Sequence, residues 1–148
     1  MHASVRPLRA DDLSSLAAAY IATFNAAPWH DEWQTDTALA YLGGLLANPA
    51  CRAWVIEHEG GLAGAAIGHL RLWWQGTELF IDEFFIGTAR QRSGLGQRLL
   101  AGIEAELHAE GVVAVTLLTG RATPAEAFYL AQGYRGNSDL QFMARSLA

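Results

Sequence analysis

The fold of this chain is decided by residues 80–100, which read FIDEFFIGTARQRSGLGQRLL. Aromatic and β-branched residues dominate positions 80–86 and favour a buried strand. From residue 95 onward, leucines recur at the spacing of a helix. The segment therefore predicts a strand that breaks near Gly87, followed by a glycine-bearing turn and a helix that begins at about Gly94.

The turn before that helix has the features of an anion site. The first backbone N–H groups of a helix lack intrahelical partners and lie at the positive end of its dipole. Gly94 and Gly96 let the backbone approach a phosphate closely, and Gln91, Arg92 and Arg98 add side-chain donors and positive charge. The alternative is a structural turn that binds no ligand.

Two other phosphate motifs match this turn poorly. A P-loop needs a lysine after its second glycine, and the chain contains no lysine. A dinucleotide fingerprint needs a third small residue and an acid after the next strand, but position 99 is leucine and residues 112–119 carry no acid. A dinucleotide-binding fragment, which would prefer NAD to CoA, is kept as an alternative.

The remaining match is Gln/Arg-x-x-Gly-x-Gly, the signature of the GNAT superfamily of acyl-CoA-dependent N-acetyltransferases, met here by Gln91, Gly94 and Gly96. Residues 119–134, with Phe128 and Tyr129, resemble a later motif of the same family. The chain looks like a small bacterial member related to aminoglycoside or polyamine N-acetyltransferases. The resemblance implies acetyl-CoA as cofactor and one GNAT domain over residues 1–148.

The expected fold class is α+β with α/β/α layers. It has a mixed, mostly antiparallel central sheet, a parallel splayed strand pair and about four helices. Patterning predicts strands at 4–8, 53–57, 62–73, 80–86 and 112–118, with a turn at 75–77 and final strand material at 134–135 and 139–145. Helices are expected up to about residue 24 and at 35–48, 94–110 and 125–132.

Composition narrows the classes of function. The chain has 148 residues, 51% of them hydrophobic, and a net charge of −5, which indicates one ordered domain. The negative charge argues against a nucleic-acid partner and suits an amine substrate. No apolar run approaches the roughly 18 residues of a membrane span, and the single cysteine forms no intrachain disulfide. We expect a cytoplasmic protein without a metal, because the five histidines lack ligand spacing.

By resemblance, the CoA diphosphate would bind the backbone N–H groups of residues 92–97, and the pantetheine would lie beside the strand edge at 84–86. Thr123 stands where the family often has an asparagine that contacts the cofactor. The predicted cofactor-binding residues are therefore Phe84, Phe85, Ile86, Gln91, Arg92, Ser93, Gly94, Leu95, Gly96, Gln97 and Thr123.

Asp82 and Glu83 are candidates for the general base that deprotonates the amine. Neighbouring strand residues face opposite sides, so only a bulge, which the family usually has in this strand, would present both. Polyamine-type members carry a Glu-Asp pair here and this chain has the reversed order, so the choice of base stays open. The alternative is a pair of strand-edge charges bound to arginines such as Arg71. Tyr129 matches the family tyrosine that protonates the CoA sulfur, and its alternative role is core packing.

The acceptor site is predicted in the loop of residues 25–34, which mixes tryptophans with carboxylates. Trp29 and Trp33 would attract a cation through their faces, and Asp31 and Glu32 would pair with ammonium groups. The alternative is that the tryptophans join two helices and the carboxylates are solvated. Exposed aromatics at 73 and 74 suggest a homodimer.

The sequence thus predicts acetyl transfer to the primary amine of a small cationic acceptor, aminoglycoside-like or polyamine-like. A protein or amino-acid N-acetyltransferase and a non-catalytic CoA-binding module are the alternatives.

Overall fold

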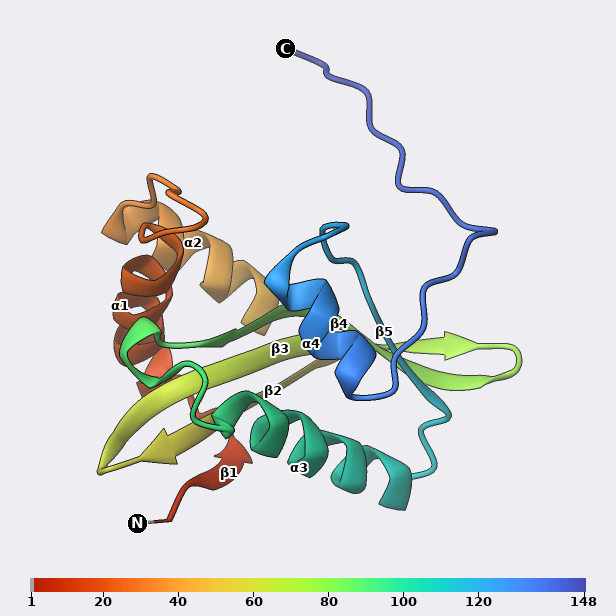
Figure 1. Ribbon diagram of the computed structural model, residues 1–148, viewed down its shortest axis with the longest axis horizontal. Coiled ribbons are helices and arrows are strands. Elements are labelled where there is room, and N and C mark those ends of the chain that lie inside the picture. Colours follow the sequence, from red (N-terminus) through yellow and green to blue (C-terminus); the bar gives the residue numbers. More distant parts are fainter. Residues whose placement is uncertain (1) are drawn as a thin grey trace. The chain divides into compact units, whose positions relative to one another are not determined.

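The computed structural model describes residues 2–148 and contains a five-stranded sheet in the order β1-β2-β3-β4-β5 (Figure 1). The strands are β1 (Ser4–Pro7), β2 (Cys51–His58), β3 (Gly61–Trp73), β4 (Gly76–Ile86) and β5 (Ala114–Leu117). Neighbouring strands are antiparallel except β4 and β5, which are parallel and joined through a helix. The mixed, mostly antiparallel sheet is confirmed.

The described residues contain four α-helices, as expected. They are α1 (Leu13–Phe24), α2 (Thr35–Leu46), α3 (Leu95–Ala109) and α4 (Pro124–Ala131). Two short 3-10 turns, Ala10–Asp12 and Thr88–Arg90, precede α1 and α3. The chain forms two compact units, one that ends at Leu118 and one from Thr119 to Ala148.

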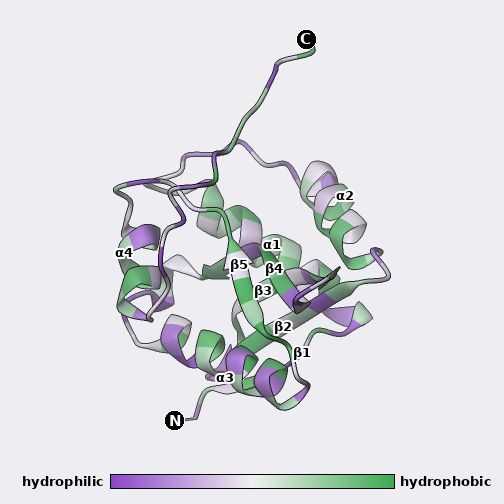
Figure 2. Cartoon of the chain, turned by 90° about the vertical axis from the view of Figure 1, so that its right-hand side faces the viewer, coloured by the Kyte–Doolittle hydropathy of each residue, from purple (hydrophilic) through white to green (hydrophobic). Residues whose placement is uncertain are grey.

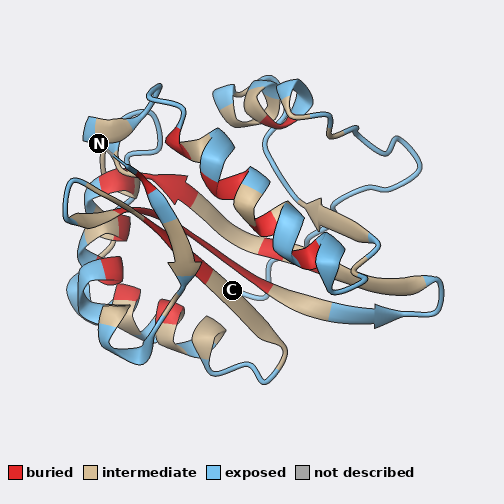
Figure 3. Ribbon diagram, turned by 90° about the horizontal axis from the view of Figure 1, so that it is seen from below, coloured by how far each residue is buried: buried red, intermediate tan, exposed pale blue. Residues whose placement is uncertain are grey.

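Within the first unit, α1 and α2 cover one face of the sheet and α3 covers the other (Figures 1 and 2). The core on the α1/α2 face consists of Leu16, Ala17, Tyr20, Leu42, Val55, Ala65, Ile67 and Phe85. On the opposite face, Trp54 donates a hydrogen bond to Glu106 of α3 over 2.7 Å. Figure 3 shows the buried residues along the strands and at repeated positions of the helices, the pattern of amphipathic elements that pack on a sheet.

A β-bulge interrupts β4 at Asp82. Ile67 of β3 pairs with Glu83, whereas the next residue, Gly68, pairs with Ile81, so Asp82 is an extra residue without a partner in the register. Directly paired residues share a face, and Ile67 belongs to the α1/α2 core, so Glu83 faces α1 and α2. The bulge therefore interrupts the alternation of side chains between the two faces of β4 at the predicted pair, Asp82 and Glu83.

Glycines on β3 make room for this irregular stretch. A Cβ atom on Gly64 would lie 2.4 Å from the carbonyl oxygen of Phe85, and one on Gly68 would lie 2.6 Å from that of Phe80. Both distances are below any ordinary contact, so the close approach of β3 and β4 requires glycine at these positions.

The parallel ladder between β4 and β5 ends just before the bulge. Its last pair is Ile81 with Leu117, and β4 continues to Ile86 with β3 as its neighbour. The edge of β4 at residues 82–86 is therefore not hydrogen-bonded to β5. The two parallel strands separate here, as expected for a splayed strand pair.

The prediction of a final strand at 134–135 and 139–145 is wrong. The described chain forms no strand after β5, and local hydrogen bonds occur in this region, such as Leu140 N–H to the carbonyl of Asn137 over 3.4 Å. Leu140 and Phe142 alternate as in a strand and both are exposed. Alternation alone does not form a strand when no neighbouring strand supplies the hydrogen bonds. None of the helices in residues 2–148 is long and apolar enough to span a membrane.

Candidate active site

Glu83 is held by two tyrosines that come from different helices. Its Oε1 accepts hydrogen bonds from the hydroxyls of Tyr20 on α1, over 2.9 Å, and Tyr41 on α2, over 2.8 Å. No residue of the described chain donates a hydrogen bond to Oε2. The side chain therefore has one fixed oxygen and one oxygen available to another partner.

Burial raises the pKa of Glu83 above its usual range, and the negative charges of Asp82 and Asp31 act in the same direction. The two phenol hydrogen bonds favour the ionised form and only partly offset this rise. Burial and the Glu83 charge also raise the pKa of both tyrosines, so their hydroxyls stay protonated and keep donating. A carboxylate with a raised pKa is suited to accept a proton near neutral pH.

Asp82 has a different partner. The Nδ1 of His69, on β3, donates to Oδ2 of Asp82 over 2.8 Å, and both side chains are half-buried. His69 lies on the same face of β3 as Ile67, because the two residues are separated by one position. The bulge therefore turns both carboxylates toward the α1/α2 face. Among residues 2–148, neither carboxylate forms the alternative ion pair with Arg71, which lies opposite Glu78 in the register.

The loop between α1 and α2 is fixed by hydrogen bonds from Asn25. Its amide donates to the carbonyl of Trp33 over 3.0 Å and accepts the Trp33 N–H over 2.9 Å. The Trp33 ring stacks on Tyr41 with ring centres 5.3 Å apart, and its Nε1 donates to Asp31 over 3.1 Å. A continuous set of contacts thus runs from Asp31 through Trp33 and Tyr41 to Glu83.

An open hollow of about 440 Å³ lies at this loop, lined by His30, Asp31, Glu32, Trp33 and Thr37. Trp33 is half-buried in the aromatic cluster, which agrees with its alternative role of joining the helices. Trp29 contacts Phe24 with ring centres 5.0 Å apart and is 44% exposed. Asp31 and Glu32 are exposed at the hollow, so this acidic and aromatic wall is accessible to a cation.

The turn before α3 has the backbone geometry of an anion site. Arg92 and Gly94 both have left-handed conformations, with φ of 62° and 81°. Gly94 is the N-cap of α3 and no side chain caps the helix, so the first N–H groups of α3 lack a side-chain acceptor. This arrangement fits the diphosphate of CoA.

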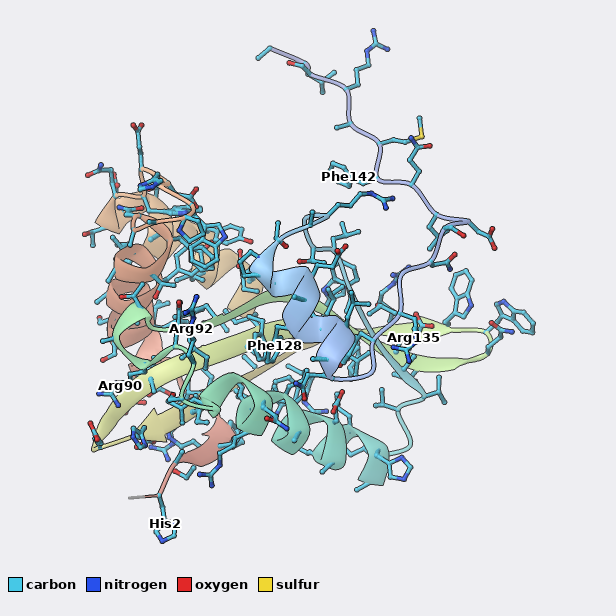
Figure 4. The ribbon with its side chains drawn as sticks, in the orientation of Figure 1. His2, Arg90, Arg92, Phe128, Arg135 and Phe142 are labelled. Atoms are coloured by element: carbon cyan, nitrogen blue, oxygen red, sulfur yellow. The ribbon has the colours of Figure 1, made fainter. Side chains whose placement is uncertain are left out.

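The side chains of the turn are used in different ways. Gln91 donates to the carbonyl of Ile86 over 2.9 Å, and Ser93 bonds the carbonyl of Arg90, so both hold the turn in shape. Arg98 donates to the carbonyl of Ala3 over 3.2 Å. Arg92 is exposed on the segment between β4 and α3 (Figure 4), so its guanidinium is the cation of the turn most accessible to a phosphate.

The second unit contains two of the predicted residues, Thr123 and Tyr129. The hydroxyl of Thr123 accepts the N–H of Glu126 over 3.1 Å and caps α4. Tyr129 is buried, and its ring contacts Phe128 and Tyr134 with ring centres 5.2 and 5.5 Å apart. Both residues have structural roles within this unit, and their roles toward CoA stay predictions.

The model of the acetyltransferase (GNAT) family matches residues 13–134. The chain belongs to the GNAT family. This GNAT protein is an N-acetyltransferase whose acetyl donor is acetyl-CoA. A comparison with curated protein sequences found no match.

Solved structures of other acetyltransferases share the fold at low sequence identity. A possible acetyltransferase from Clostridium difficile 630 has a TM-score of 0.81 and 17% identity, with 100% of both chains covered. AAC(6')-Iy in complex with a CoA-S-monomethyl-acetylneamine bisubstrate analogue has a TM-score of 0.75 and 16% identity, with 99% of both chains covered. An aminoglycoside acetyltransferase from an uncultured soil metagenomic sample, in complex with sisomicin, has a TM-score of 0.75 and 14% identity over 99% of this chain and 97% of that one.

Sequence reasoning missed three residues of the GNAT protein's candidate site: Tyr20, Tyr41 and His69. Tyr20 lies on the buried side of α1 together with Leu16 and Ala17. A phenol hydroxyl on such a side needs a polar partner when it is buried, and this requirement was the available signal. The partner itself could not be identified, because it lies 63 residues away on β4.

Proposed function

We propose that this enzyme transfers the acetyl group of acetyl-CoA to the primary amine of a small cationic acceptor, aminoglycoside-like or polyamine-like. The observation that carries the proposal is Glu83, whose Oε2 is available and whose Oε1 is bonded by Tyr41, the residue on which Trp33 of the acidic and aromatic loop stacks. Two enzymes of similar fold support it, since their structures hold sisomicin or an acetylneamine analogue.

The acceptor loop would recognise the cation. Asp31 and Glu32 are exposed carboxylates at the hollow, and the Trp29 and Trp33 rings offer faces to ammonium groups. Ammonium groups in excess of the reacting amine would pair with these carboxylates. This preference is the reason for proposing an acceptor with more than one positive charge.

Glu83 is the proposed general base, and Asp82 is assigned to holding His69. Glu83 takes the proton of the amine directly or through one water. Bound acetyl-CoA supplies the thioester carbonyl carbon, to which the amine nitrogen bonds while the carbon–sulfur bond breaks. Tyr129 then gives its proton to the departing thiolate, a role proposed on the family resemblance.

The cofactor would be held by the strand edge at residues 84–86 and the turn at 91–97, with Arg92 beside the phosphates. We also propose that residues 1–148 act as one GNAT domain, since the family match continues across the boundary after Leu118. A homodimer stays a prediction, supported by Trp73 and Trp74, which are 50% and 82% exposed. The cytoplasmic location also stays a prediction.

The test is thiol release from acetyl-CoA in the presence of neamine, spermidine, single amino acids and a peptide with a free N-terminus, with the products identified by mass. Neamine or spermidine should give the highest kcat/KM and gain one acetyl group. Turnover restricted to the peptide or to amino acids would support the alternative acetyltransferases. Binding of acetyl-CoA with no thiol release for any amine would support the non-catalytic module.

A further inference from the structure

We propose that Tyr20 and Tyr41 are positioning residues of the reaction, which hold Oε1 of Glu83 and thereby leave Oε2 as the oxygen that takes the proton of the amine. The proposal rests on Glu83 as the base in the function proposed above. It concerns residues of two helices that none of the sequence motifs includes.

The geometry of the two hydrogen bonds carries the inference. Both hydroxyls donate to the same oxygen, over 2.9 and 2.8 Å, although they come from separate helices. Two donors that converge on one oxygen restrict rotation of the carboxylate, because a turn about its last torsion would break both bonds. Oε2, which none of the described residues binds, then has a fixed direction.

An aromatic cluster holds the tyrosines in place. The Tyr20 ring contacts Phe24 and Phe85, with ring centres 4.6 and 5.7 Å apart. Trp33 of the acceptor loop contacts both tyrosine rings, each with ring centres 5.3 Å apart. The loop that would bind the acceptor is therefore packed directly on the residues that orient the base.

The groups around Glu83 shift its pKa in opposite directions. Asp82 on its own strand and Asp31 on the loop raise the pKa of Glu83, and burial raises it most. Tyr20 and Tyr41 lower it, and His69 is bonded to Asp82. Removing one phenol hydroxyl should therefore raise the pKa of Glu83 further, since the ionised form loses a donor.

The experiment measures kcat/KM against pH for Tyr20→Phe, Tyr41→Phe and the wild-type enzyme, with the best amine from the panel. Each substitution keeps the ring and removes one hydrogen bond. The acid limb should move to higher pH by about one unit, while the KM for acetyl-CoA stays the same. The control is Phe24→Leu, which disturbs the packing around Tyr20 without removing a hydroxyl. It should lower the melting temperature and leave the acid limb in place.

A second readout does not depend on turnover. The carboxyl ¹³C shift of Glu83 in labelled protein reports its pKa directly, and this pKa should rise in both tyrosine variants. An unchanged pKa and an unchanged acid limb would overturn the positioning role. A raised pKa in an enzyme that acetylates no amine would instead refute the proposed function and leave the hydrogen bonding of Glu83 established. If one variant fails to fold, the other still reports, because each hydroxyl bonds Oε1 independently.

Discussion

Replacement of Glu83 by glutamine removes the proposed base and keeps its shape. The amide oxygen can still accept hydrogen bonds from the hydroxyls of Tyr20 and Tyr41. In the wild-type protein these hydroxyls lie 2.9 and 2.8 Å from Oε1 of Glu83. General-base assistance contributes about 10²–10⁴ to a rate. We therefore expect kcat to fall by that factor, which corresponds to about 2.7–5.4 kcal/mol of activation free energy at 1.36 kcal/mol per factor of ten.

Stability should change in the opposite sense. Because burial raises the pKa of Glu83, its ionised form is disfavoured in the folded protein. Such a carboxyl contributes stability below its unfolded pKa, and this contribution is lost as the pH rises through the folded value. At pH 8 the neutral glutamine avoids the cost of the buried charge. The melting temperature of Glu83→Gln should therefore equal or exceed that of the wild type.

The assay combines initial rates of thiol release, acetyl-CoA binding by calorimetry and thermal unfolding at pH 8. Glu78→Gln is the matched control, since Glu78 lies on the same strand outside the bulge. It should keep wild-type kcat. A Glu83→Gln enzyme that turns over within threefold of the wild type would refute the assignment of the base. A fall in kcat that is accompanied by an equal loss of acetyl-CoA affinity would also refute this assignment.

Three further substitutions test neighbouring features. Asp82→Asn removes a charge that raises the pKa of Glu83, so the acid limb of kcat/KM should move to lower pH, opposite to the tyrosine variants; a shift to higher pH would contradict this. Gly64→Ala places a Cβ 2.4 Å from a backbone oxygen of β4 and should cost ~1–3 kcal/mol in urea unfolding; wild-type stability would show that the strands adjust freely. The hydrogen bond from Arg6 lowers the pKa of Asp12 from 3.8 to about 2. The ionised Asp12 therefore stabilises the folded protein above pH 3.8, and this contribution is lost as the pH falls toward 2. Asp12→Asn should therefore cost about 1–2 kcal/mol at pH 7, less near pH 2, and an equal loss at both pH values would refute the ion pair.

The sequence predicted most of the fold because its signals are local. The helix of residues 94–110 was expected from leucine spacing and the glycine turn before it, and the structure has it at Leu95–Ala109. The strand at 80–86 was expected from its aromatic and β-branched residues and is the second half of β4. The expected strand at 139–145 failed because strand formation depends on a neighbour, which no local pattern supplies.

The candidate site was predictable only in part. The Asp82–Glu83 pair and the glycine turn are visible as motifs, and so is the acidic loop with its tryptophans. The bulge depends on which residues of β3 pair with β4, and thus on register. The partners of the two carboxylates come from α1, α2 and β3, at sequence separations of 63, 42 and 13 residues. Such contacts follow from tertiary packing and leave no spacing signal.

A crystal structure of this enzyme with a CoA-linked acceptor analogue would test most directly whether Glu83 is the base and whether the turn before α3 binds CoA. We expect the diphosphate to lie against the N–H groups of residues 92–97. We also expect the acceptor nitrogen within about 2.6–3.2 Å of Glu83 Oε2, or one water away. An acceptor nitrogen bound by the Asp82–His69 pair instead, or distant from both carboxylates, would contradict the account.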